Sequence, residues 1–370
     1  MKVIMTGGGT GGHVNPAIAI ADCIKDNDPS SEIIFVGTHR GIENKLVPRA
    51  GYELKHVEIR GLKRSLSIEN IKTAYYVLTA PHKAARIIKD FCPDIVIGTG
   101  GYVCWPVLKA AQRMGIPTVL HESNAVPGVA VKMLEGKADR IFLNFDSAEA
   151  YLSHPEKAVH TGNPLRGEFL HISYEEAREK LGITGKYRRF ILSCGGSMGA
   201  ERVNDMALAL MRGYTSHHPD VLHVHACGAI ERELCTSQFK EMGLDSCENI
   251  KLLEYIYDMP LEMAAADIVI CRAGAMTLSE LAALGKPCVL IPSPHVAGNH
   301  QVINARTLER AGAAVVFEES GLGDGSDFVD AVKRLTEDEE RLEVMSDAIA
   351  SFHVPDAKKI IYKEISELVK

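Results

Sequence analysis

The sequence lacks the features that would assign it quickly to several common classes of protein. Its nine cysteines include no C-x-x-C pair, which is typical of reduced thiols in a cytosolic protein. No apolar run approaches the roughly 18 residues that a membrane-spanning helix needs, and the N-terminus has no apolar signal-peptide core. The net charge of −7 argues against a general nucleic-acid binder. We therefore expect a cytosolic protein with no nucleic-acid partner, which leaves attachment to a membrane surface open.

Short apolar strands alternate with helical stretches along all 370 residues, enough chain for two or three domains. This alternation is typical of parallel sheets covered by helices on both faces, so the sequence predicts an α/β fold. The strands predicted in the first half are Lys2–Met5, Glu32–Val36, Asp94–Ile97, Thr118–Leu120 and Arg140–Leu143. Those predicted in the second half are Arg189–Ser193, Val221–Val224, Ile250–Leu253, Ile268–Ile270, Cys288–Ile291 and Ala314–Phe317.

The pattern restarts after a turn-rich junction, Thr161-Gly162-Asn163-Pro164. Residues 189–200 repeat the opening unit of strand, glycine loop and helix, which indicates two similar doubly wound domains. We place the first domain at residues 1–162 and the second at residues 163–345. Residues 346–370 then contain an amphipathic helix, Asp356–Val369, which we expect to pack back on the first domain. A ligand would lie between the domains, at the C-terminal ends of the strands.

The stretch Met5–Pro16, MTGGGTGGHVNP, concentrates glycines at the mouth of a predicted helix. Asn15 is a good N-cap and Pro16 a good first helical residue, so we expect the helix to begin there. The exposed N–H groups of such a turn favour a phosphate or another electron-rich group. A P-loop would need Lys-Ser/Thr after the glycines, and a dinucleotide fold would need an acid soon after the second strand, where none occurs before Glu43. The loop therefore predicts a phosphate or sugar site of a third kind.

Two further glycine loops follow predicted strands, at Gly98–Gly101 and Gly195–Gly199. Three such loops in one α/β chain suggest a polyanionic or sugar ligand, although Gly98–Gly101 alone is equally consistent with a plain turn. His13 lies at the helix mouth, where the helix dipole disfavours its protonated form. A neutral imidazole there suits general-base chemistry on a sugar hydroxyl. The polar run His121-Glu122-Ser123-Asn124 follows another predicted strand and is a second candidate for site residues.

The segment Cys271–Glu280 follows a predicted strand and opens a helix with small residues, whose first turn can meet a phosphate. Glu280 lies near the start of that helix, where its carboxylate could accept from both hydroxyls of a ribose. The alternative is that Glu280 only caps the helix or complements its dipole. Another polar loop, Pro292–Gln301, leads into a helix that carries Asn304.

Taken together, these segments resemble the MurG family of bacterial cell-wall glycosyltransferases. The resemblance spans residues 1 to 312, in the family's order, through the motifs GGGTGGHVNPA, GTGGYVCWP, HESNAVPG, GNPLR, CGGSMGA, CRAGAMTLSE and PSPHVAGNHQVINA. It implies a GT-B fold, in which two Rossmann-like domains face each other across a cleft. It also implies transfer of N-acetylglucosamine, with inversion, from UDP-N-acetylglucosamine to the muramyl 4-hydroxyl of lipid I, which gives lipid II for peptidoglycan synthesis. No cofactor or metal site is expected.

The resemblance also assigns individual residues. His13 matches the proposed base of the family. Ile256 matches a residue whose backbone meets the uracil, Glu280 the contact to the ribose hydroxyls, and Gln301 a glutamine near the donor sugar. The full set of expected substrate contacts is Thr10, Gly11, Gly12, Asn124, Arg166, Ser197, Ile256, Ala275, Met276, Thr277, Leu278, Ser279, Glu280 and Gln301. The residues that depart from those common in the family are Ser123, Met198, His300 and the pair Cys104-Trp105.

The stretch Gly61–Lys89 mixes apolar side chains with Lys63, Arg64, Lys72, Lys83, Arg86 and Lys89. Apolar residues among basic ones suit an anionic membrane surface, although a core helix with a solvated face is equally consistent. The resemblance favours peripheral attachment at the cytoplasmic face of the plasma membrane, because lipid I is held in the membrane. It further implies partners among the cell-wall synthesis proteins and a part in cell shape and division.

Other classes of function stay open from the residues themselves. A nicotinamide-dependent oxidoreductase is one, which the missing ribose acid disfavours. A UDP-sugar 2-epimerase, or a nucleotide-sugar sensor without catalysis, would use a similar fold but no second substrate. Release of UDP only in the presence of a lipid I analogue would separate a transferase from both.

Overall fold

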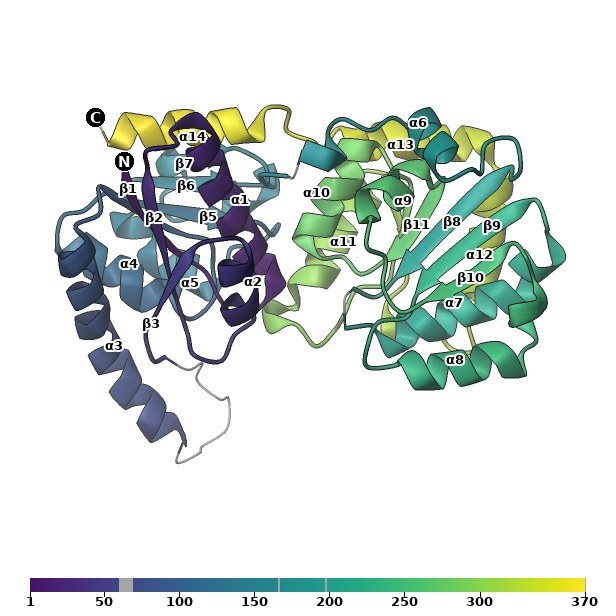
Figure 1. Cartoon of the computed structure of the whole chain (residues 1–370), viewed down its shortest axis with the longest axis horizontal. Coiled ribbons are helices and arrows are strands. Elements are labelled where there is room, and N and C mark those ends of the chain that lie inside the picture. Colours follow the sequence, from purple (N-terminus) through teal and green to yellow (C-terminus); the bar gives the residue numbers. More distant parts are fainter. Residues whose placement is uncertain (60–68, 166, 197, 370) are drawn as a thin grey trace. The chain divides into compact units, whose positions relative to one another are not determined.

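The computed structural model describes residues 1–59, 69–165, 167–196 and 198–369. The chain divides into two compact units, Met1–Leu165 with Val354–Lys370, and Arg166–His353. Each unit is a parallel sheet covered by helices (Figure 1), so the predicted α/β fold is confirmed. The second unit ends at His353, eight residues beyond the boundary at 345 that the sequence suggested. The reason is that α13 (Glu339–Ala350) packs on α10 (Ala275–Leu284) of the second unit.

Within the described residues, the first unit forms a seven-stranded sheet in the order β3-β2-β1-β4-β5-β6-β7, with neighbouring strands parallel. The order changes direction between β1 and β4, which is where sheets of this kind bind ligands. The strands are β1 (Lys2–Thr6), β2 (Glu32–Gly37), β3 (Glu53–His56), β4 (Ile95–Gly98), β5 (Thr118–Glu122), β6 (Arg140–Leu143) and β7 (Ala158–His160).

Two layers of helices cover this sheet. The first layer is α1 (Gly11–Asn27), α2 (Glu43–Arg49) and α14 (Ala357–Leu368), and the second is α3 (Glu69–Phe91), α4 (Cys104–Arg113) and α5 (Val129–Leu134). The C-terminal helix α14 packs against α1 (Figure 1), and its Ile361 and Ile365 join the buried core between the sheet and these helices. The segment Val354–Lys370 is thus part of the first compact unit.

Within the described part of the second unit, a six-stranded parallel sheet has the order β10-β9-β8-β11-β12-β13. Its strands are β8 (Arg189–Cys194), β9 (Val221–Ala226), β10 (Ile250–Leu253), β11 (Ile268–Cys271), β12 (Cys288–Leu290) and β13 (Ala314–Val316). The remaining helices are α6 (Tyr174–Lys180), α7 (Glu201–Gly213), α8 (Arg232–Glu241), α9 (Met259–Ala265), α11 (His300–Arg310) and α12 (Ser326–Glu337).

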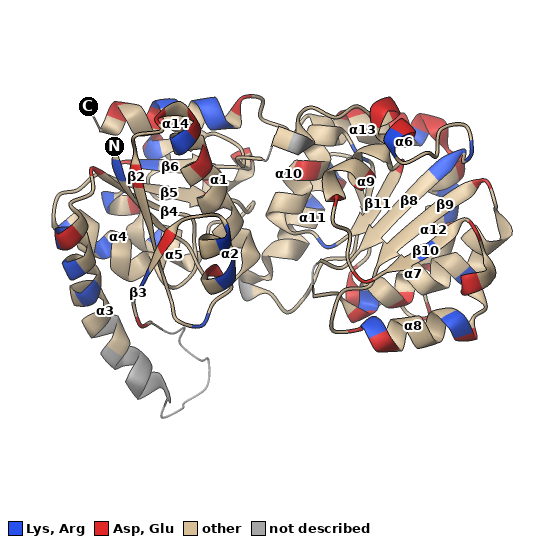
Figure 2. Ribbon diagram, in the orientation of Figure 1, with Lys and Arg blue, Asp and Glu red and all other residues tan. Residues whose placement is uncertain are grey.

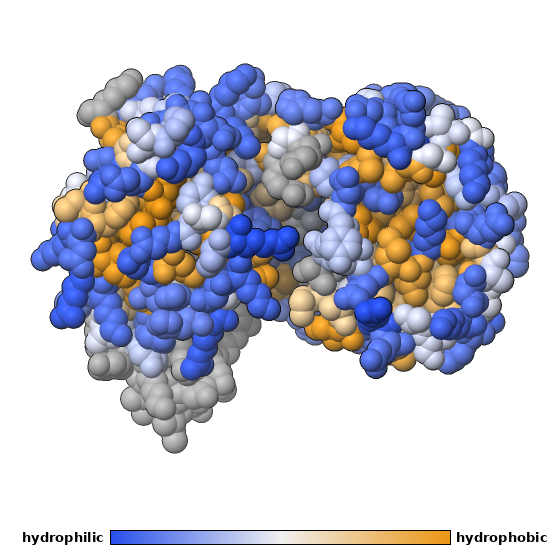
Figure 3. All heavy atoms as spheres, viewed as in Figure 1, coloured by the Kyte–Doolittle hydropathy of each residue, from blue (hydrophilic) through white to orange (hydrophobic). Residues whose placement is uncertain are grey.

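The strands predicted from apolar runs are confirmed, with ends displaced by at most two residues. The prediction missed β3 and β7, which are the two edge strands of the first sheet and contain exposed and half-buried residues but no buried one. Such strands bury too little apolar surface to stand out in a sequence. Hydrophilic residues cover much of the visible surface of both units (Figure 3). Among the described helices, none is long and apolar enough to cross a membrane.

Candidate active site

The first glycine loop passes into α1 earlier than predicted. The helix begins at Gly11 with Thr10 as its N-cap, so Asn15 and Pro16 lie inside it and the prediction of a start at Asn15 is wrong. The apolar stripe that packs α1 on the sheet already begins at Val14, which requires the preceding turn to be helical. The glycine-rich segment therefore supplies the first helical turn as well as the loop.

His13 is the third residue of α1, and residues after β4 hold it. Its Nδ1 lies 3.2 Å from the Thr99 carbonyl oxygen, and the Thr99 hydroxyl donates to the His13 carbonyl oxygen at 2.7 Å. Because a carbonyl oxygen can only accept, Nδ1 carries the proton and Nε2 keeps the lone pair. The imidazole is thus held in the tautomer that a general base needs.

Gly100 lies directly against the His13 imidazole. Its φ of +113° suits glycine, and an added Cβ would collide with the ring. The sequence placed Gly98–Gly101 among three glycine loops that suggest a polyanionic or sugar ligand, but did not predict that Thr99 and Gly100 would orient the histidine. Among the other residues predicted from the first loop, Thr10 and Gly12 are exposed and Gly11 is half-buried.

Asn124, another predicted contact, is held by a buried acid. The Glu122 carboxylate accepts hydrogen bonds from the Asn124 backbone N–H at 3.0 Å, from Asn124 Nδ2 at 2.9 Å and from the Gly128 N–H at 2.7 Å. His121 and Glu122 belong to β5 itself rather than to the loop after it, and Ser123 is also buried. Burial lowers the pKa of His121 to about 4, so this histidine is neutral. Asn124 is therefore the half-exposed member of the predicted polar run.

In the second unit, the predicted segment Ala275–Glu280 forms the first six residues of α10. Gly274 precedes it as the N-cap and has no side chain with which to cap the helix. Leu278 is buried in the core, and the Ser279 hydroxyl donates to the Ala275 carbonyl oxygen at 3.1 Å. The helix N-terminus has the polarity that attracts a phosphate.

Glu280 lies in the second turn of α10, half-buried and past the positions at which caps and dipole interactions act. Burial raises the pKa of the thiols of Cys194 and Cys271, and the charge of Glu280 adds to both shifts. Glu280 therefore lies near the ends of β8 and β11, whose last residues these cysteines are. This position disfavours the purely capping role and leaves the ribose contact as a prediction.

Gln301 and Asn304 fix the polar loops around α10. Gln301 Oε1 accepts the Ser293 N–H at 2.9 Å, which directs the Gln301 amide nitrogen to act as a donor elsewhere. The buried Asn304 Nδ2 donates to the Ala273 carbonyl oxygen at 3.3 Å, just before α10. Asn304 thus holds the turn that starts the predicted phosphate segment.

Ile256 follows β10 and is only 4% exposed. Tyr255 and Tyr257 on either side are 47% and 94% exposed, with ring centroids 5.2 Å apart. The predicted backbone contact of Ile256 to uracil stays a prediction.

The third glycine loop, after β8, is held by a buried network. His225 Nε2 lies 3.1 Å from Asn204 Oδ1, and Asn204 Nδ2 donates to the Cys227 carbonyl oxygen at 3.1 Å. Gly199, with φ +87°, packs against the same Cys227 carbonyl. Nothing in the sequence pattern predicted this network. Two predicted contacts, Arg166 and Ser197, lie outside the described residues.

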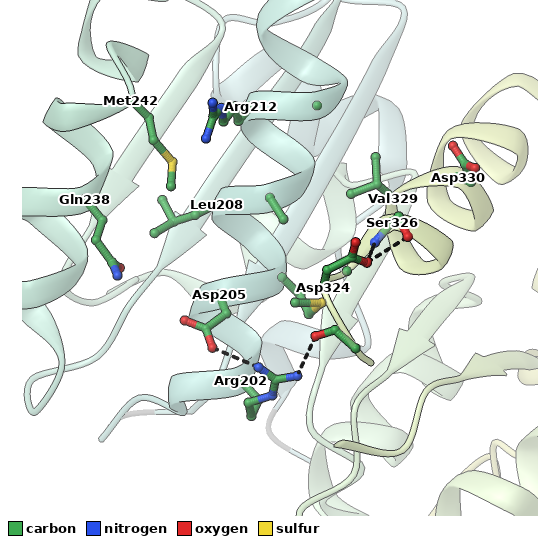
Figure 4. A pocket seen from close by; sticks show the side chains of 15 residues that line it. Arg202, Asp205, Leu208, Arg212, Gln238, Met242, Asp324, Ser326, Val329 and Asp330 are labelled. Atoms are coloured by element: carbon green, nitrogen blue, oxygen red, sulfur yellow. Dashed lines mark hydrogen bonds and ion pairs between the residues drawn. The ribbon is translucent and has the colours of Figure 1, made fainter. Parts of the chain in front are cut away.

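An open cavity of about 650 Å³ lies between α7, α8 and α12 of the second unit (Figure 4). Its charged side chains interact locally: Arg202 pairs with Asp205 at 3.3 Å, and Asp324 accepts from the Ser326 hydroxyl at 2.7 Å. None of the predicted site residues lines it. The candidate site is therefore at the strand ends and not in this cavity.

The sequence matches the Glycosyltransferase family 28 N-terminal domain over residues 3–143 and the family's C-terminal domain over residues 190–361. It is 45% identical over 370 residues to the UDP-N-acetylglucosamine–N-acetylmuramyl-(pentapeptide) pyrophosphoryl-undecaprenol N-acetylglucosamine transferase of Acetivibrio thermocellus, covering 100% of this chain and 99% of the relative. The chain belongs to the MurG family. The Bacillus licheniformis enzyme of the same name is 39% identical over 368 residues, covering 100% and 99% of the two chains.

Solved structures agree with membership of the MurG family. The crystal structure of Acinetobacter baumannii MurG has a TM-score of 0.79 and 26% identity, covering 99% of both chains. UDP-GlcNAc 2-epimerase from Neisseria meningitidis, solved with UDP-GlcNAc bound, has a TM-score of 0.68 over 99% of this chain and 100% of its own. At 15% identity, this second likeness shows the fold alone. The predicted GT-B fold of two Rossmann-like units is confirmed.

Proposed function

We propose that this chain transfers N-acetylglucosamine from UDP-N-acetylglucosamine to the muramyl 4-hydroxyl of lipid I, with inversion, and so makes lipid II. The family supports this assignment, since its relatives carry this activity in their names. The observation that carries the mechanism is the His13 imidazole, whose Nδ1–H is directed to the Thr99 carbonyl oxygen so that Nε2 can accept a proton.

The proposed reaction is a single displacement. His13 Nε2 takes the proton of the acceptor hydroxyl while the hydroxyl oxygen attacks the anomeric carbon of N-acetylglucosamine. The bond from that carbon to the UDP oxygen breaks, the electron pair leaves with UDP, and attack from the opposite face inverts the configuration. The N-terminus of α10 stabilises the charge that develops on the diphosphate. Glu280 accepts from the ribose hydroxyls, and the amide nitrogen of Gln301 donates to the transferred sugar.

A UDP-sugar 2-epimerase is the alternative, because its members share the fold and the nucleotide sugar. The test is release of UDP from UDP-N-acetylglucosamine with and without a short-chain lipid I analogue. We expect release only when the analogue is present, together with a disaccharide product. Formation of UDP-N-acetylmannosamine without any acceptor would instead establish the epimerase.

We also propose that the enzyme reaches lipid I as a peripheral protein at the cytoplasmic face of the plasma membrane. Exposed basic residues support this, because Lys83, Arg86 and Lys89 lie on the described part of α3 (Figure 2). Ile88 belongs to the buried core, and Ile87 is partly buried against it, so these two isoleucines are not free to enter a bilayer. Residues 60–68, and the side chains of residues 69–75, 77 and 78, lie outside the described residues.

A further inference from the structure

Glu43 is a buried carboxylate that the proposed reaction does not use. It is the first residue of α2, and its exposed fraction is 0%. Burial opposes ionisation of this group, but hydrogen bonds from the Gly9 N–H and from Thr38 outweigh it and hold the pKa of Glu43 below its usual value. A buried anion with such well-formed partners calls for an explanation.

The Glu43 carboxylate joins two loops of the first unit. Its Oε2 accepts the Gly9 N–H at 2.9 Å, in the glycine loop after β1. Its Oε1 accepts the Thr38 N–H at 2.9 Å and the Thr38 hydroxyl at 2.8 Å, in the loop after β2. One side chain therefore fastens the glycine loop to the neighbouring connection of the sheet.

Three glycines make room for this carboxylate. At Gly8, Gly37 and Gly41, an added Cβ would come closer than 3.0 Å to the Glu43 side chain. Gly8 lies in the loop after β1, Gly37 is the last residue of β2, and Gly41 precedes α2. The local sequence is therefore built around Glu43 on three sides, and a larger residue at any of these positions would displace it.

The contact at Gly9 acts on the start of α1. Gly9 has a φ of +88°, and the next residue, Thr10, is the N-cap whose carbonyl oxygen accepts the His13 N–H at 3.1 Å. The Gly8 N–H also donates to the Gly100 carbonyl oxygen at 3.3 Å, and Gly100 follows Thr99, whose carbonyl oxygen accepts from the His13 ring. Because Gly9 donates to a carboxylate, its N–H is not offered to a phosphate, contrary to the expectation from the glycine pattern alone.

From these contacts we infer that Glu43 is a positioning residue. By accepting the Gly9 N–H, it fixes where α1 begins and so where the His13 imidazole meets the acceptor hydroxyl. This role rests on the proposed function, in which His13 is the base. Glu43 itself touches neither substrate, and its effect on turnover passes through His13.

A double-mutant cycle of Glu43→Gln and His13→Ala tests the inference. Gln has nearly the same size but must place an N–H₂ group against either the Gly9 N–H or the Thr38 N–H. We expect Glu43→Gln to lower kcat about 10- to 100-fold when His13 is present, since small displacements of a catalytic group cost rates of this order. In the His13→Ala background we expect less than about a threefold further loss, because the two residues act as one unit. Equal losses in both backgrounds would show a merely structural role and overturn the inference.

Two further measurements keep the test decisive. Thr38→Val removes one donor to Glu43 but leaves the Gly9 contact, so it should lower stability slightly and leave kcat within about threefold of wild type.

In wild-type protein labelled with ¹⁵N-glycine, the amide of the exposed Gly9 should exchange slowly with solvent. Rapid exchange of that amide would overturn the inference even if Glu43→Gln fails to fold. If the wild type releases no UDP in response to acceptor, the proposed function fails instead, which is a separate outcome.

Discussion

Thr99 and His13 are joined at two points. The Thr99 hydroxyl holds the His13 carbonyl oxygen at 2.7 Å, and the Thr99 carbonyl oxygen lies 3.2 Å from His13 Nδ1. One residue after β4 thus fixes both the backbone and the ring of a residue in the first turn of α1. Backbone attachment sets the position of the imidazole, and the ring contact sets its tautomer, so both requirements of a general base come from a single neighbour.

The first prediction concerns His13 itself. His13→Ala should lower kcat by roughly 10²–10⁴, the usual cost of losing a general base. The Kd for UDP should stay nearly unchanged, because the predicted contacts to uracil and ribose, Ile256 and Glu280, lie in the second unit. Acceptor-dependent UDP release and calorimetric binding of UDP measure the two effects. His39→Ala, at an exposed histidine of the same unit, is the matched control and should behave as wild type. A His13→Ala enzyme with near-normal kcat would remove His13 from the role of base.

Glu280 provides the second prediction. Glu280→Gln should weaken UDP and UDP-N-acetylglucosamine equally, by roughly 1.5–3 kcal/mol for each charge-assisted bond to a ribose hydroxyl. An equal loss is expected because both ligands carry the same ribose. Isothermal titration calorimetry measures both affinities, and Glu340→Gln, on an exposed position of α13, controls for the change in charge. If affinity is unchanged and only the Tm falls, Glu280 is a structural residue of α10.

The sequence was sufficient to predict the parts of this fold that depend on local pattern. The apolar run Arg140–Leu143 gave a strand with the observed ends, since β6 is buried from its second residue onward and buried parallel strands are apolar. The predicted start of α1 was wrong because Asn15 and Pro16 carry strong local signals for a helix start. Packing of Val14 on the sheet outweighed those signals.

Contacts between distant residues could not be predicted in this way. Thr99 lies 86 positions from His13, and Glu43 lies 34 positions from Gly9. Each pair meets only because parallel strands bring their C-terminal ends to one edge of the sheet. Glu43 entered the sequence analysis merely as an acid too late for a dinucleotide site, because nothing local shows that α2 turns its first side chain toward the glycine loop.

The third prediction concerns stability in acid. His223 and His225 are buried beside Ser193, whose hydroxyl lies 2.9 Å from His223 Nε2 and 2.8 Å from His225 Nδ1. Burial lowers the pKa of His223 to about 3 and that of His225 to about 4, against 6.5 in the unfolded chain. Between these values the unfolded chain binds more protons than the folded one, so folding stability falls as the pH drops below about 6.5. Calorimetric scans from pH 7.5 to pH 4.5 should show a steady fall in Tm.

A variant separates this contribution from general acid effects. His223→Gln removes one titrating group from the buried pair, so its Tm should fall less steeply with acid than that of wild type, whatever its Tm at neutral pH. His217→Gln, at an exposed histidine with no such burial, should leave the slope unchanged. Identical slopes in all three proteins would mean that the buried pair does not govern acid stability.

The last prediction concerns the membrane. The acceptor carries a long isoprenoid chain that cannot leave the bilayer cheaply, so the enzyme has to reach it there. The exposed Lys83 and Arg86 of α3 should attract an anionic surface, each worth about 1 kcal/mol, and salt should screen this attraction. We expect binding to vesicles that contain phosphatidylglycerol, weak binding to pure phosphatidylcholine, and a loss of binding as ionic strength rises. Sedimentation with vesicles measures all three.

Charge reversal tests whether α3 is the surface responsible. Lys83→Glu with Arg86→Glu should lower partitioning roughly 30-fold or more, because two contributions of about 1 kcal/mol are removed and two repulsions added. The matched control, Lys240→Glu with Lys333→Glu, changes the net charge equally on exposed positions of the second unit and should keep most of the binding. Turnover of a soluble short-chain acceptor should stay normal in both, since neither pair touches the proposed site. Equal binding to neutral and anionic vesicles, or equal losses in the two double variants, would exclude α3 as the electrostatic contact.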